Sequence, residues 1–586
     1  KEWFEQFAPD YQGQYMKDLL RYAAPLNEEG QVPNEMVIDI GLFEYPHPVN
    51  LSNLDAVYVA TEDAGLANGT SWAHAISDLK LAIIAMANPT GSEKTKEKKI
   101  YVRDGVYTVG QLSHDNVAFP LYASNDDSHG ISLEIVGSCT GVGHEQNFSK
   151  PTVLTVNPVQ QNTTNILLDI RTENKPVTVS GLTFVNSSQG DGTAVTMPGR
   201  GVNIMDIGAG AKVTLKNVAF RNNYGYGISS VENKGELLIA NALFADGAFA
   251  DDSTGVGLQT VGKTTVVNAT FAQNRKDIEV KDGAPAPVVR NSVSWNNEVQ
   301  NLSDAEGTAN VNFPAGTENN DIQNGPNFIN PMAEDVLERD YGIRPSLNLL
   351  NRGDNEIYNE LVLDEPSAQN IPATERDLAN NSRQTGTKVD VGAYEYSADL
   401  QQVIYVKPVV GGNGTGESWA NATSDLQGAI DLVAVYAANN PGSKGYVFVH
   451  NTQPINNRLR VSMPGTMIYG SMNDEVSDQT DVEGLVSDLV NKRQGILQNN
   501  RRTQISQGLD ITASSVVDGF EIAGGVQLGN DGCLSTSIVK GPVQGVTGGT
   551  TGLLYNTLVT DDEAGTAGNV NGVQAVNVTA AGTIAD

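Results

Sequence analysis

The chain has 586 residues, more than one compact core accommodates, so a solenoid or several domains are expected. Its 69 acidic residues outnumber 37 basic ones, and the net charge of −32 at pH 7 disfavours binding to nucleic acid phosphates and to anionic membranes. No apolar run approaches the roughly 18 residues of a membrane-spanning helix, so no membrane insertion is predicted.

A long internal repeat divides the chain into three parts. Residues 58–83 match residues 405–430 without a gap, and the phrase DIGLFEY at 39–45 resembles DVGAYEY at 390–396. The repeat predicts the closing tail of a preceding unit at residues 1–50, a complete β-helix domain at 54–397, and a second β-helix domain at 401–586 that lacks its closing segment.

Each unit is expected to open with a strand, a Gly/Asn-rich loop and a helix. Ser77 is placed to cap a helix over 78–88, and Ser424 to cap a helix that runs through Asn439. The apolar residues of the first helix share one face, so we expect it to lie over the first coil, where a solenoid needs a cap. The matching residues Trp72 and Trp419 are interpreted as anchors of this cap.

The middle of the first unit repeats a shorter phrase at nearly regular intervals. Such a period indicates one coil of a parallel β-helix, built from three short strands and their turns. The phrase predicts an asparagine ladder at Asn217, Asn241, Asn268 and Asn291, and an inward aromatic stack at Phe184, Phe220, Phe244 and Phe271. A further inward column is predicted at Ile170, Ile207, Val231, Val261 and Val280.

The last segment repeats with shorter coils. Regularly spaced glycines precede an aligned set of residues, Cys533, Leu553 and Val573. Cys533 is therefore interpreted as a small buried residue of a stack. The other cysteine, Cys139, falls in the first unit, so we expect the two thiols to remain unpaired with each other.

Together these patterns predict an all-β fold, a right-handed parallel β-helix (solenoid) in tandem domains, each with an N-terminal capping helix. The opening SWA…DL..AI, the Asn-rich rungs, DYGIRPSLNLLNRGDN at 340–355 and the closing VDVGAYEY resemble secreted surface proteins of the pectin-lyase-like β-helix superfamily. The closing motif is similar to that of choice-of-anchor proteins of Bacteroidetes-like bacteria. The resemblance implies an extracellular or bacterial cell-surface location, but the superfamily includes lyases, hydrolases and adhesins, so the fold does not decide the activity.

Catalysis on this scaffold needs clustered acidic groups on neighbouring rungs. A lyase requires Ca²⁺ ligands and a base, and a glycoside hydrolase requires two carboxylates. The candidate catalytic residues are Asp169, Asp206 and Arg171, since Arg171 shares a strand face with Asp169 and Asp206 follows one coil later if the register holds. The alternative is an ordinary solvated face, because the same column continues with Ser230, Thr260 and Glu279.

A second candidate site is a sugar-binding patch at Trp295, Asn296 and Asn297. Aromatic rings among amides stack on sugar rings, and the alternative is that a loop covers Trp295. The histidines lack zinc-site spacing, so no metal site and no cofactor are predicted; Ca²⁺ is the one ion that the acidic surface would suit.

The tandem repeat and the sparse catalytic signal favour an extracellular structural or adhesive protein, an adhesin. The alternatives are a polysaccharide lyase or glycoside hydrolase, and a carbohydrate-binding module. The predicted partners are polysaccharide and the protein itself, which would assemble head to tail into a filament when residues 1–45 meet the C-terminal coil of another copy. The competing interpretation is that the chain is part of a longer polypeptide.

Overall fold

A computed structural model describes residues 50–585 of the chain, apart from several internal segments. The described part divides into two compact units. Of the described residues, the first comprises 50–317, 330–342 and 351–395, and the second comprises 318–329, 343–350 and 396–585. Among the described helices, none is long and apolar enough to span a membrane. The segments outside the description are 1–49, 90–95, 109–116, 124–131, 156–165, 186–198, 231–232, 248–254, 301, 303–308, 320–324, 347, 386–387, 397–399, 410–413, 500, 547–549, 563–566 and 586.

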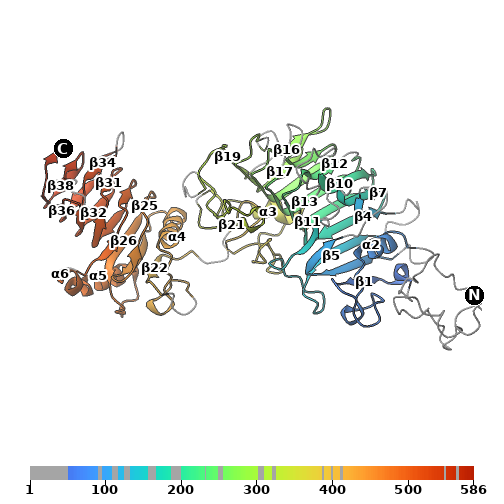
Figure 1. The fold of residues 1–586 in the computed structure, drawn as a ribbon, viewed down its shortest axis with the longest axis horizontal. Helices are drawn as coiled ribbons and strands as arrows, with labels where there is room; N and C mark the ends of the chain where they lie inside the picture. The colour runs from blue at the N-terminus through green and yellow to red at the C-terminus, as the bar shows by residue number, and fades with distance from the viewer. Residues whose placement is uncertain are drawn as a thin grey trace, which may run out of the picture. The chain divides into compact units, whose positions relative to one another are not determined.

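The first unit is built from two parallel sheets whose strands follow the chain from coil to coil (Figure 1). The larger sheet is 13-stranded: β1 (Ala56–Val59), β2 (Lys98–Arg103), β3 (Gly105–Thr108), β5 (Leu133–Cys139), β6 (Thr152–Thr155), β8 (Val177–Ser180), β9 (Leu182–Val185), β11 (Lys212–Arg221), β13 (Glu236–Ala245), β15 (Thr264–Ala272), β17 (Val288–Arg290), β18 (Val293–Trp295) and β19 (Val311–Phe313). The other is 6-stranded: β4 (Val117–Tyr122), β7 (Ile166–Thr172), β10 (Gly199–Ile207), β12 (Gly225–Ser230), β14 (Val256–Thr260) and β16 (Lys276–Val280).

The four predicted asparagines align on successive rungs and mark a bend in the large sheet, but their amides bond as two pairs, because Asn241 Oδ1 accepts no bond from Asn268. All four have left-handed backbones, with φ of 53° at Asn217, 51° at Asn241, 55° at Asn268 and 51° at Asn291. Asparagine adopts this conformation more readily than most residues. Asn241 Nδ2 donates to Asn217 Oδ1 at 2.8 Å, and Asn291 Nδ2 to Asn268 Oδ1 at 3.3 Å. The bend turns β11, β13 and β15 around a corner of the coil.

The predicted phenylalanine stack is confirmed. The rings of Phe184, Phe220, Phe244 and Phe271 lie parallel inside the coil, with successive centroids 5.0, 4.9 and 4.8 Å apart. A row of buried asparagine amides accompanies them, for example Asn274 Nδ2, which donates to the carbonyl oxygen of Phe244 at 2.9 Å. Both rows belong to one continuous core.

The predicted Ile/Val column is wrong beyond Ile170. The register pairs Ile170 with Ile204, and a bulge follows before Asp206. The inward column of this sheet is Leu168, Val202, Ile228, Leu258 and Ile278. Ile207 is buried but lies past the bulge, Val261 is half-buried, Val280 is 39% exposed, and Val231 lies outside the described residues.

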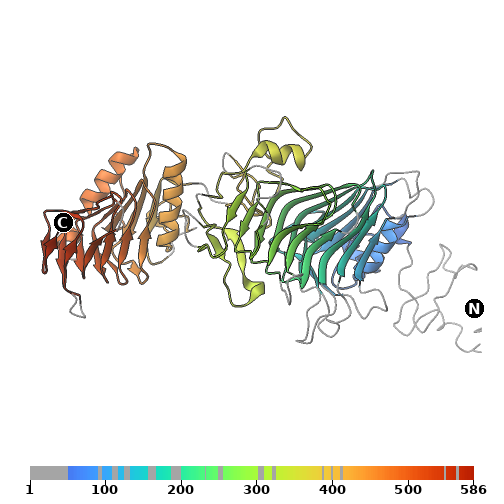
Figure 2. The ribbon, with the colours of Figure 1, turned by 90° about the horizontal axis from the view of Figure 1, so that it is seen from above.

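A helix covers the first coil of each unit, as expected. Helix α2 (Leu79–Ala87) buries Leu79, Ile83 and Met86 in the core of the first unit, and α4 (Leu426–Asn439) does the same in the second. Figure 2 shows each helix beside the first strands of its unit. The N-caps differ from the predicted serines, because the carboxylates of Asp78 and Asp425 accept the backbone N–H groups of Leu81 and Gly428.

The second unit has three parallel sheets, and each coil contributes one strand to each. One sheet is 7-stranded: β22 (Val403–Val406), β23 (Gly445–His450), β26 (Thr466–Met472), β29 (Val516–Asp518), β32 (Cys533–Ser535), β35 (Leu553–Tyr555) and β38 (Gln574–Val576). The second comprises β24 (Pro454–Ile455), β27 (Thr503–Ile505), β30 (Phe520–Ala523), β33 (Ile538–Lys540), β36 (Leu558–Thr560) and β39 (Thr579–Ala580). The third comprises β25 (Leu459–Val461), β28 (Leu509–Ile511), β31 (Val526–Leu528), β34 (Val543–Gly545), β37 (Val570–Asn571) and β40 (Ile584–Ala585).

The chain is therefore a right-handed parallel β-helix protein, with a core that runs through successive coils. Outside the sheets lie α5 (Val482–Lys492) and α6 (Gln494–Gln498) in the second unit and α3 (Asn355–Leu361) in the closing segment of the first. The matching phrase at residues 39–45 lies outside the described residues.

One detail of the shorter repeat needs correction. In the sheet register Cys533 pairs with Leu553, and Leu553 pairs on the next coil with Gln574 instead of Val573. The last coil is therefore one residue longer than the spacing predicted. The inward stack is Leu534 and Leu554, which are buried, followed by the half-buried Ala575, and Cys533 is half-buried beside it. Both cysteines are free thiols, and burial raises the pKa of Cys139 to about 12.

Candidate functional site

The predicted catalytic residue Asp169 is held in a hydrogen-bond network on the six-stranded sheet. Its side chain is 1% exposed. Oδ2 accepts from the Tyr122 hydroxyl at 2.7 Å and from Arg171 Nη2 at 3.1 Å, and Oδ1 accepts from Asn203 Nδ2 at 2.7 Å. Arg171 thus meets Asp169 as predicted, but donors occupy both carboxylate oxygens.

Asp206 does not join this cluster as predicted. The register places Asn203 opposite Asp169, while Asp206 lies beyond the bulge and opposite Arg171. The outward column is Asp169, Asn203, Ser229, Gln259 and Glu279, so Ser230 and Thr260 are each one position away from it. Gln259 Nε2 donates to Glu279 Oε2 at 2.6 Å, and Ser229 Oγ donates to Gln259 Oε1 at 2.9 Å. These contacts link successive rungs and leave no pair of free carboxylates there.

The predicted sugar-binding patch is covered. Trp295 is 2% exposed and its Nε1 donates to the carbonyl oxygen of Thr317 at 3.0 Å. Asn297 is fully buried and belongs to the internal amide row, with Nδ2 donating to the carbonyl oxygen of Phe271. Asn296 has a left-handed backbone and lies at the turn between them. The ring of Trp295 therefore has no exposed face on which a sugar could stack.

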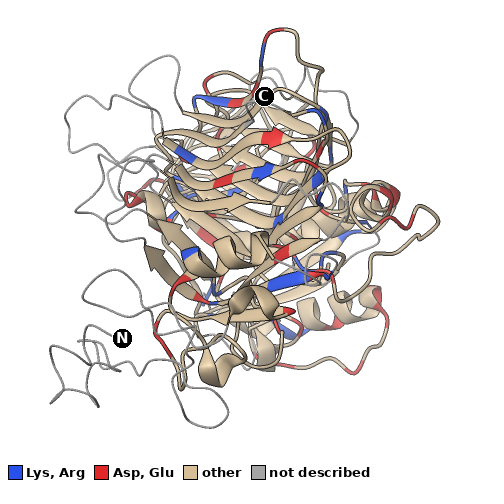
Figure 3. Ribbon diagram, turned by 90° about the vertical axis from the view of Figure 1, so that its right-hand side faces the viewer, with Lys and Arg blue, Asp and Glu red and all other residues tan. Residues whose placement is uncertain are grey.

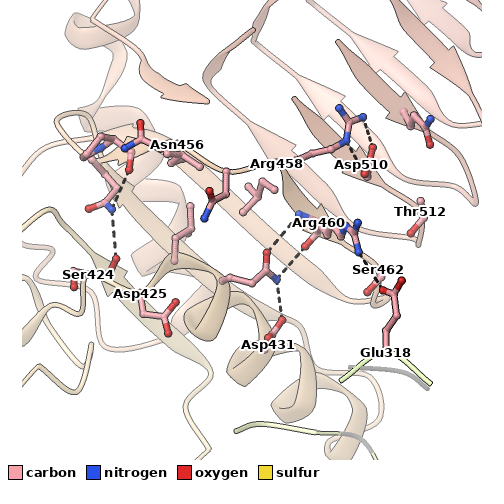
Figure 4. Close-up of a pocket in the computed structure, with 18 residues that line it drawn as sticks. Glu318, Ser424, Asp425, Asp431, Asn456, Arg458, Arg460, Ser462, Asp510 and Thr512 are labelled. Atoms are coloured by element: carbon pink, nitrogen blue, oxygen red, sulfur yellow. Dashed lines mark hydrogen bonds and ion pairs between the residues drawn. The ribbon is translucent and has the colours of Figure 1, made fainter. Parts of the chain in front are cut away.

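The described residues hold a different candidate site, a polar groove in the second unit. It has a volume of about 920 Å³ and lies between the start of α4 and the outer face of the third sheet (Figure 4). Arg458, Arg460 and Asp510 line one wall, and Asp425 and Asp431 of α4 line the other. We refer to this site as the α4 groove.

Two interactions give the α4 groove its shape. Arg458 and Asp510 form a two-pronged ion pair, in which Nε donates to Oδ2 at 2.8 Å and Nη2 donates to Oδ1. Gln427 bridges helix and sheet, since its Nε2 donates both to Asp431 Oδ1 at 2.9 Å and to the carbonyl oxygen of Arg460 at 3.2 Å. Paired planar groups of this kind lose little freedom on binding a ligand.

The carboxylates of the α4 groove differ in their surroundings. Asp425 caps the helix, and Asp510 is held by Arg458. Asp431 is 8% exposed, and burial, with a further contribution from Asp425, raises its pKa to about 7. Near neutral pH the groove therefore contains one carboxyl group that gains or loses a proton readily.

The wall of the α4 groove continues along the solenoid. Arg460, Asp510, Gln527, Gln544 and Asn571 are register partners on successive coils of the third sheet. All point outward, and all but the half-buried Asp510 are exposed. Neighbouring strands lie about 4.8 Å apart, so the row presents one polar side chain per step.

Sequence reasoning missed this groove, although one signal was present. In the repeat, Asp431 falls where the first unit has Ile84, so an acid replaces an apolar residue on a cap helix. The contacts of Arg458 and Asp510 gave no such signal, because the two residues are far apart in sequence. In the part of the chain that is described, no three His, Cys, Asp or Glu side chains gather as metal ligands, and Ca²⁺ binding stays a prediction.

Charge is distributed evenly over the strands. Figure 3 shows acidic and basic residues interspersed, without gathering into one large patch in that view.

Comparisons with known proteins add little beyond this geometry. No family model matches the chain, and no curated protein matches it. Among solved structures, a pectate lyase is 14% identical over 59% of this chain and 98% of its own, with a TM-score of 0.26. The A-module of a mannuronan C-5 epimerase from Azotobacter vinelandii is 11% identical over 84% of this chain and 91% of its own, with a TM-score of 0.19. A pectin methylesterase bound to a hexasaccharide is 11% identical over 45% of this chain and 68% of its own, also with a TM-score of 0.19. Similarities this low do not indicate what the site binds or catalyses.

Proposed function

We propose that the chain is an extracellular adhesive β-helix protein that binds a neutral polysaccharide in the α4 groove. The observation that carries the proposal is the row of outward polar side chains that leads out of the groove at one residue per coil. A carbohydrate chain offers repeated hydroxyl groups, which both donate and accept hydrogen bonds. Amide and paired ionic groups at a regular spacing complement such a ligand.

The charge of the chain favours a neutral polymer over an acidic one. A net charge of −32 raises the energy of any approaching polyanion, especially at low ionic strength. Arg458, one of the two arginines of the groove, is neutralised by Asp510. Neutral hydroxyl groups meet no such barrier.

Binding without turnover is the expected behaviour. Glycoside hydrolysis uses two carboxyl groups, one as an acid and one as a base or nucleophile. In the α4 groove, Asp425 and Asp510 are engaged as a helix cap and an ion pair, Glu318 lies exposed 4.0 Å from Arg460, and Asp431 is the carboxyl group whose pKa is raised by burial. The groove therefore supports recognition better than bond cleavage.

The binding proposal is tested with purified protein and neutral glucans, mannans and xylans in affinity electrophoresis and calorimetry. Replacing Gln527 or Gln544 with alanine removes one hydrogen-bonding group each, worth about 0.5–1.5 kcal/mol, so affinity should fall roughly two- to twelvefold. Gln504→Ala is the matched control, because Gln504 is also exposed but faces outward from the neighbouring sheet.

Three outcomes distinguish binding in the α4 groove, hydrolysis in the groove, and a groove that binds no polysaccharide. Saturable binding that the groove variants weaken and Gln504→Ala does not is the expected result. Release of reducing ends that disappears in Asp431→Asn would replace the binding role with a hydrolase. Lack of binding to any neutral polymer, or equal binding by all variants, would remove the α4 groove as the site.

The raised pKa of Asp431 predicts a pH-dependent stability of the second unit. The unfolded side chain ionises near 3.8 and the folded one near 7, so the folded state binds more protons between these values and stability falls as pH rises through that window. Asp431→Asn should remove this penalty. The stability difference between variant and wild type should widen from pH 4 to 7, to at most about 4 kcal/mol.

Urea denaturation at several pH values measures the difference. Asp474→Asn, at an exposed aspartate of the same unit, serves as the control and should show little change. A difference between the Asp431 variant and wild type that is constant from pH 4 to 8 would show that Asp431 titrates normally.

A further inference from the structure

The asparagine ladder of the first unit is a docking surface for that unit's closing segment. Asn268 Nδ2 donates to the carbonyl oxygens of Asp390 at 2.9 Å and Gly392 at 3.3 Å. Asn291 contributes its carbonyl oxygen, which accepts from the Gly392 N–H at 2.8 Å. The Ala393 N–H donates to Thr270 Oγ1 at 3.0 Å. The ladder therefore satisfies backbone groups of a separate segment.

The phrase DVGAYEY suits this docking for local reasons. Gly392 has a φ of +101°, and a Cβ atom there would lie 2.8 Å from Thr270 Oγ1, so a larger residue would push the segment away. The Glu395 carboxylate accepts from the N–H groups of Thr385 and Asp390 and holds the segment in its turn. Asp390 Oδ1 accepts from the Asn351 N–H at 2.7 Å.

Apolar contacts complete the first-unit interface. Leu238 and Val267 on the outer face of the ladder strands form a buried cluster with side chains of the closing segment. The segment contributes Tyr358, Ile371 and Val389. Burial of this cluster adds a hydrophobic contribution that the hydrogen bonds alone would not supply.

The second unit carries a similar ladder at its last coils, with its side chains exposed. Asn556 and Asn577 have φ of 47° and 55°, and Asn577 Nδ2 donates to Asn556 Oδ1 at 2.8 Å. Thr579 follows Asn577 at the same interval as Thr270 follows Asn268. In the described residues, no other side-chain hydrogen bond of these two asparagines occurs.

Exposed apolar residues flank this second ladder. Tyr555 is 47% exposed, Val576 41% and Leu558 40%, next to the asparagines. Tyr555 and Val576 each immediately precede a ladder asparagine, the position that Val267 occupies in the first unit, where it is fully buried. Exposed apolar side chains around unused amides indicate an interaction surface.

We propose that residues 39–45 of a second copy of this chain dock on the surface formed by Tyr555, Asn556, Leu558, Val576, Asn577 and Thr579. The segment DIGLFEY shares Asp, Gly, Glu and Tyr with DVGAYEY at the same positions. Gly41 takes the place of Gly392 in the match, and its lack of a side chain permits the same close approach to Thr579. The ladder of the first unit is already occupied by its own segment, whereas the side chains of Asn556 and Asn577 are exposed.

The contact joins different surfaces of the two copies, so it propagates head to tail and does not close as a symmetric dimer. It differs from an end cap, because in the first unit the segment crosses successive coils along the ladder instead of covering the last one. The inference is independent of the α4 groove, which lies on another sheet of the unit.

The docking is tested with the full chain and a fluorescent peptide of residues 33–50. Saturable binding of the peptide is expected, and Val576→Glu or Asn577→Ala in the protein should weaken it about tenfold or more. A peptide carrying Gly41→Val should bind at least tenfold more weakly than the natural one. Asn491→Ala, at an exposed asparagine of α5, is the control and should bind the peptide normally.

Light scattering over a range of protein concentrations tests whether the segment docks on a second copy of the chain. Mass that rises with concentration in the full chain, and that Val576→Glu abolishes while Asn491→Ala does not, supports the proposal. A mass of one chain at all concentrations overturns it even if the peptide binds, because docking would then occur within one chain. Equal binding of the natural and Gly41→Val peptides overturns the proposed contact itself.

Discussion

Replacing Phe244 with alanine is expected to lower the free energy of unfolding of the first unit by about 3–5 kcal/mol. The ring is fully buried and lies between Phe220 and Phe271, with centroids 4.9 and 4.8 Å away. Its loss removes transfer energy and leaves a cavity that neighbouring coils cannot fill, because backbone hydrogen bonds hold them in register on both sides. Phe220→Ala should act similarly.

Urea denaturation, followed by a probe that resolves the two units, measures this change. Val106→Ala is a suitable control, because Val106 is 59% exposed on β3 of the same unit and its truncation should cost little. Equal stability of Phe244→Ala and wild type would contradict the inward position of the ring.

Replacing Arg383 with methionine is expected to cost about 3–5 kcal/mol and to loosen the closing segment. The guanidinium is fully buried, and Nη2 donates to the carbonyl oxygens of Asp390 and Gly392 at 2.8 and 2.9 Å. Burial raises the pKa of Asp377 and of Glu395, and Arg383 opposes that rise. Without the cation, buried acids of this segment lose the charge that stabilises their ionised form.

The cost should therefore grow as pH rises. Removing Arg383 raises the pKa values of Asp377 and Glu395 in the folded state further above their unfolded values. Between the unfolded and folded pKa values, the unfolded acids are ionised while the folded ones stay protonated, so the free energy of unfolding falls as pH rises. Denaturation at pH 5 and pH 8 compares the two conditions. Arg376→Met, at an exposed arginine of the same segment, is the control. A small, pH-independent cost for Arg383→Met would mean that the segment does not depend on this cation.

Local sequence patterns predicted the rungs well, because each repeated residue has a local physical requirement. Asn217 and its equivalents satisfy a left-handed bend, and Phe244 fills the core at the same place in each coil. The cap helices were also predictable, but their N-caps were placed one residue early. Ser77 precedes Asp78 and Ser424 precedes Asp425, and serine and aspartate are equally good caps, so the sequence offers no choice between neighbours.

Register between coils was predictable only where no irregularity intervened. Asn203 meets Asp169 ahead of the bulge between Ile204 and Asp206, and the bulge then places Asp206 opposite Arg171 instead of Thr172. A shift of this kind moves every later residue relative to the neighbouring strand, and short strands carry too little pattern to reveal it. For Trp295 the sequence left an exposed ring and a loop-covered ring both open, and the structure shows the covered ring, because the segment that covers it is recognised by its path and not by its composition.

By itself, the sequence determined that this protein coils and that its asparagines and phenylalanines align from rung to rung, because those properties recur with the period of the coil. The tertiary structure alone decided which outward residues share a surface. Arg458 meets Asp510 one coil later, past an inserted pair of helices, and α4 supplies Asp431 from before both. Many polar residues are tolerated at outward positions with a similar free energy of folding. The sequence pattern therefore does not identify which outward residues become neighbours in the folded chain.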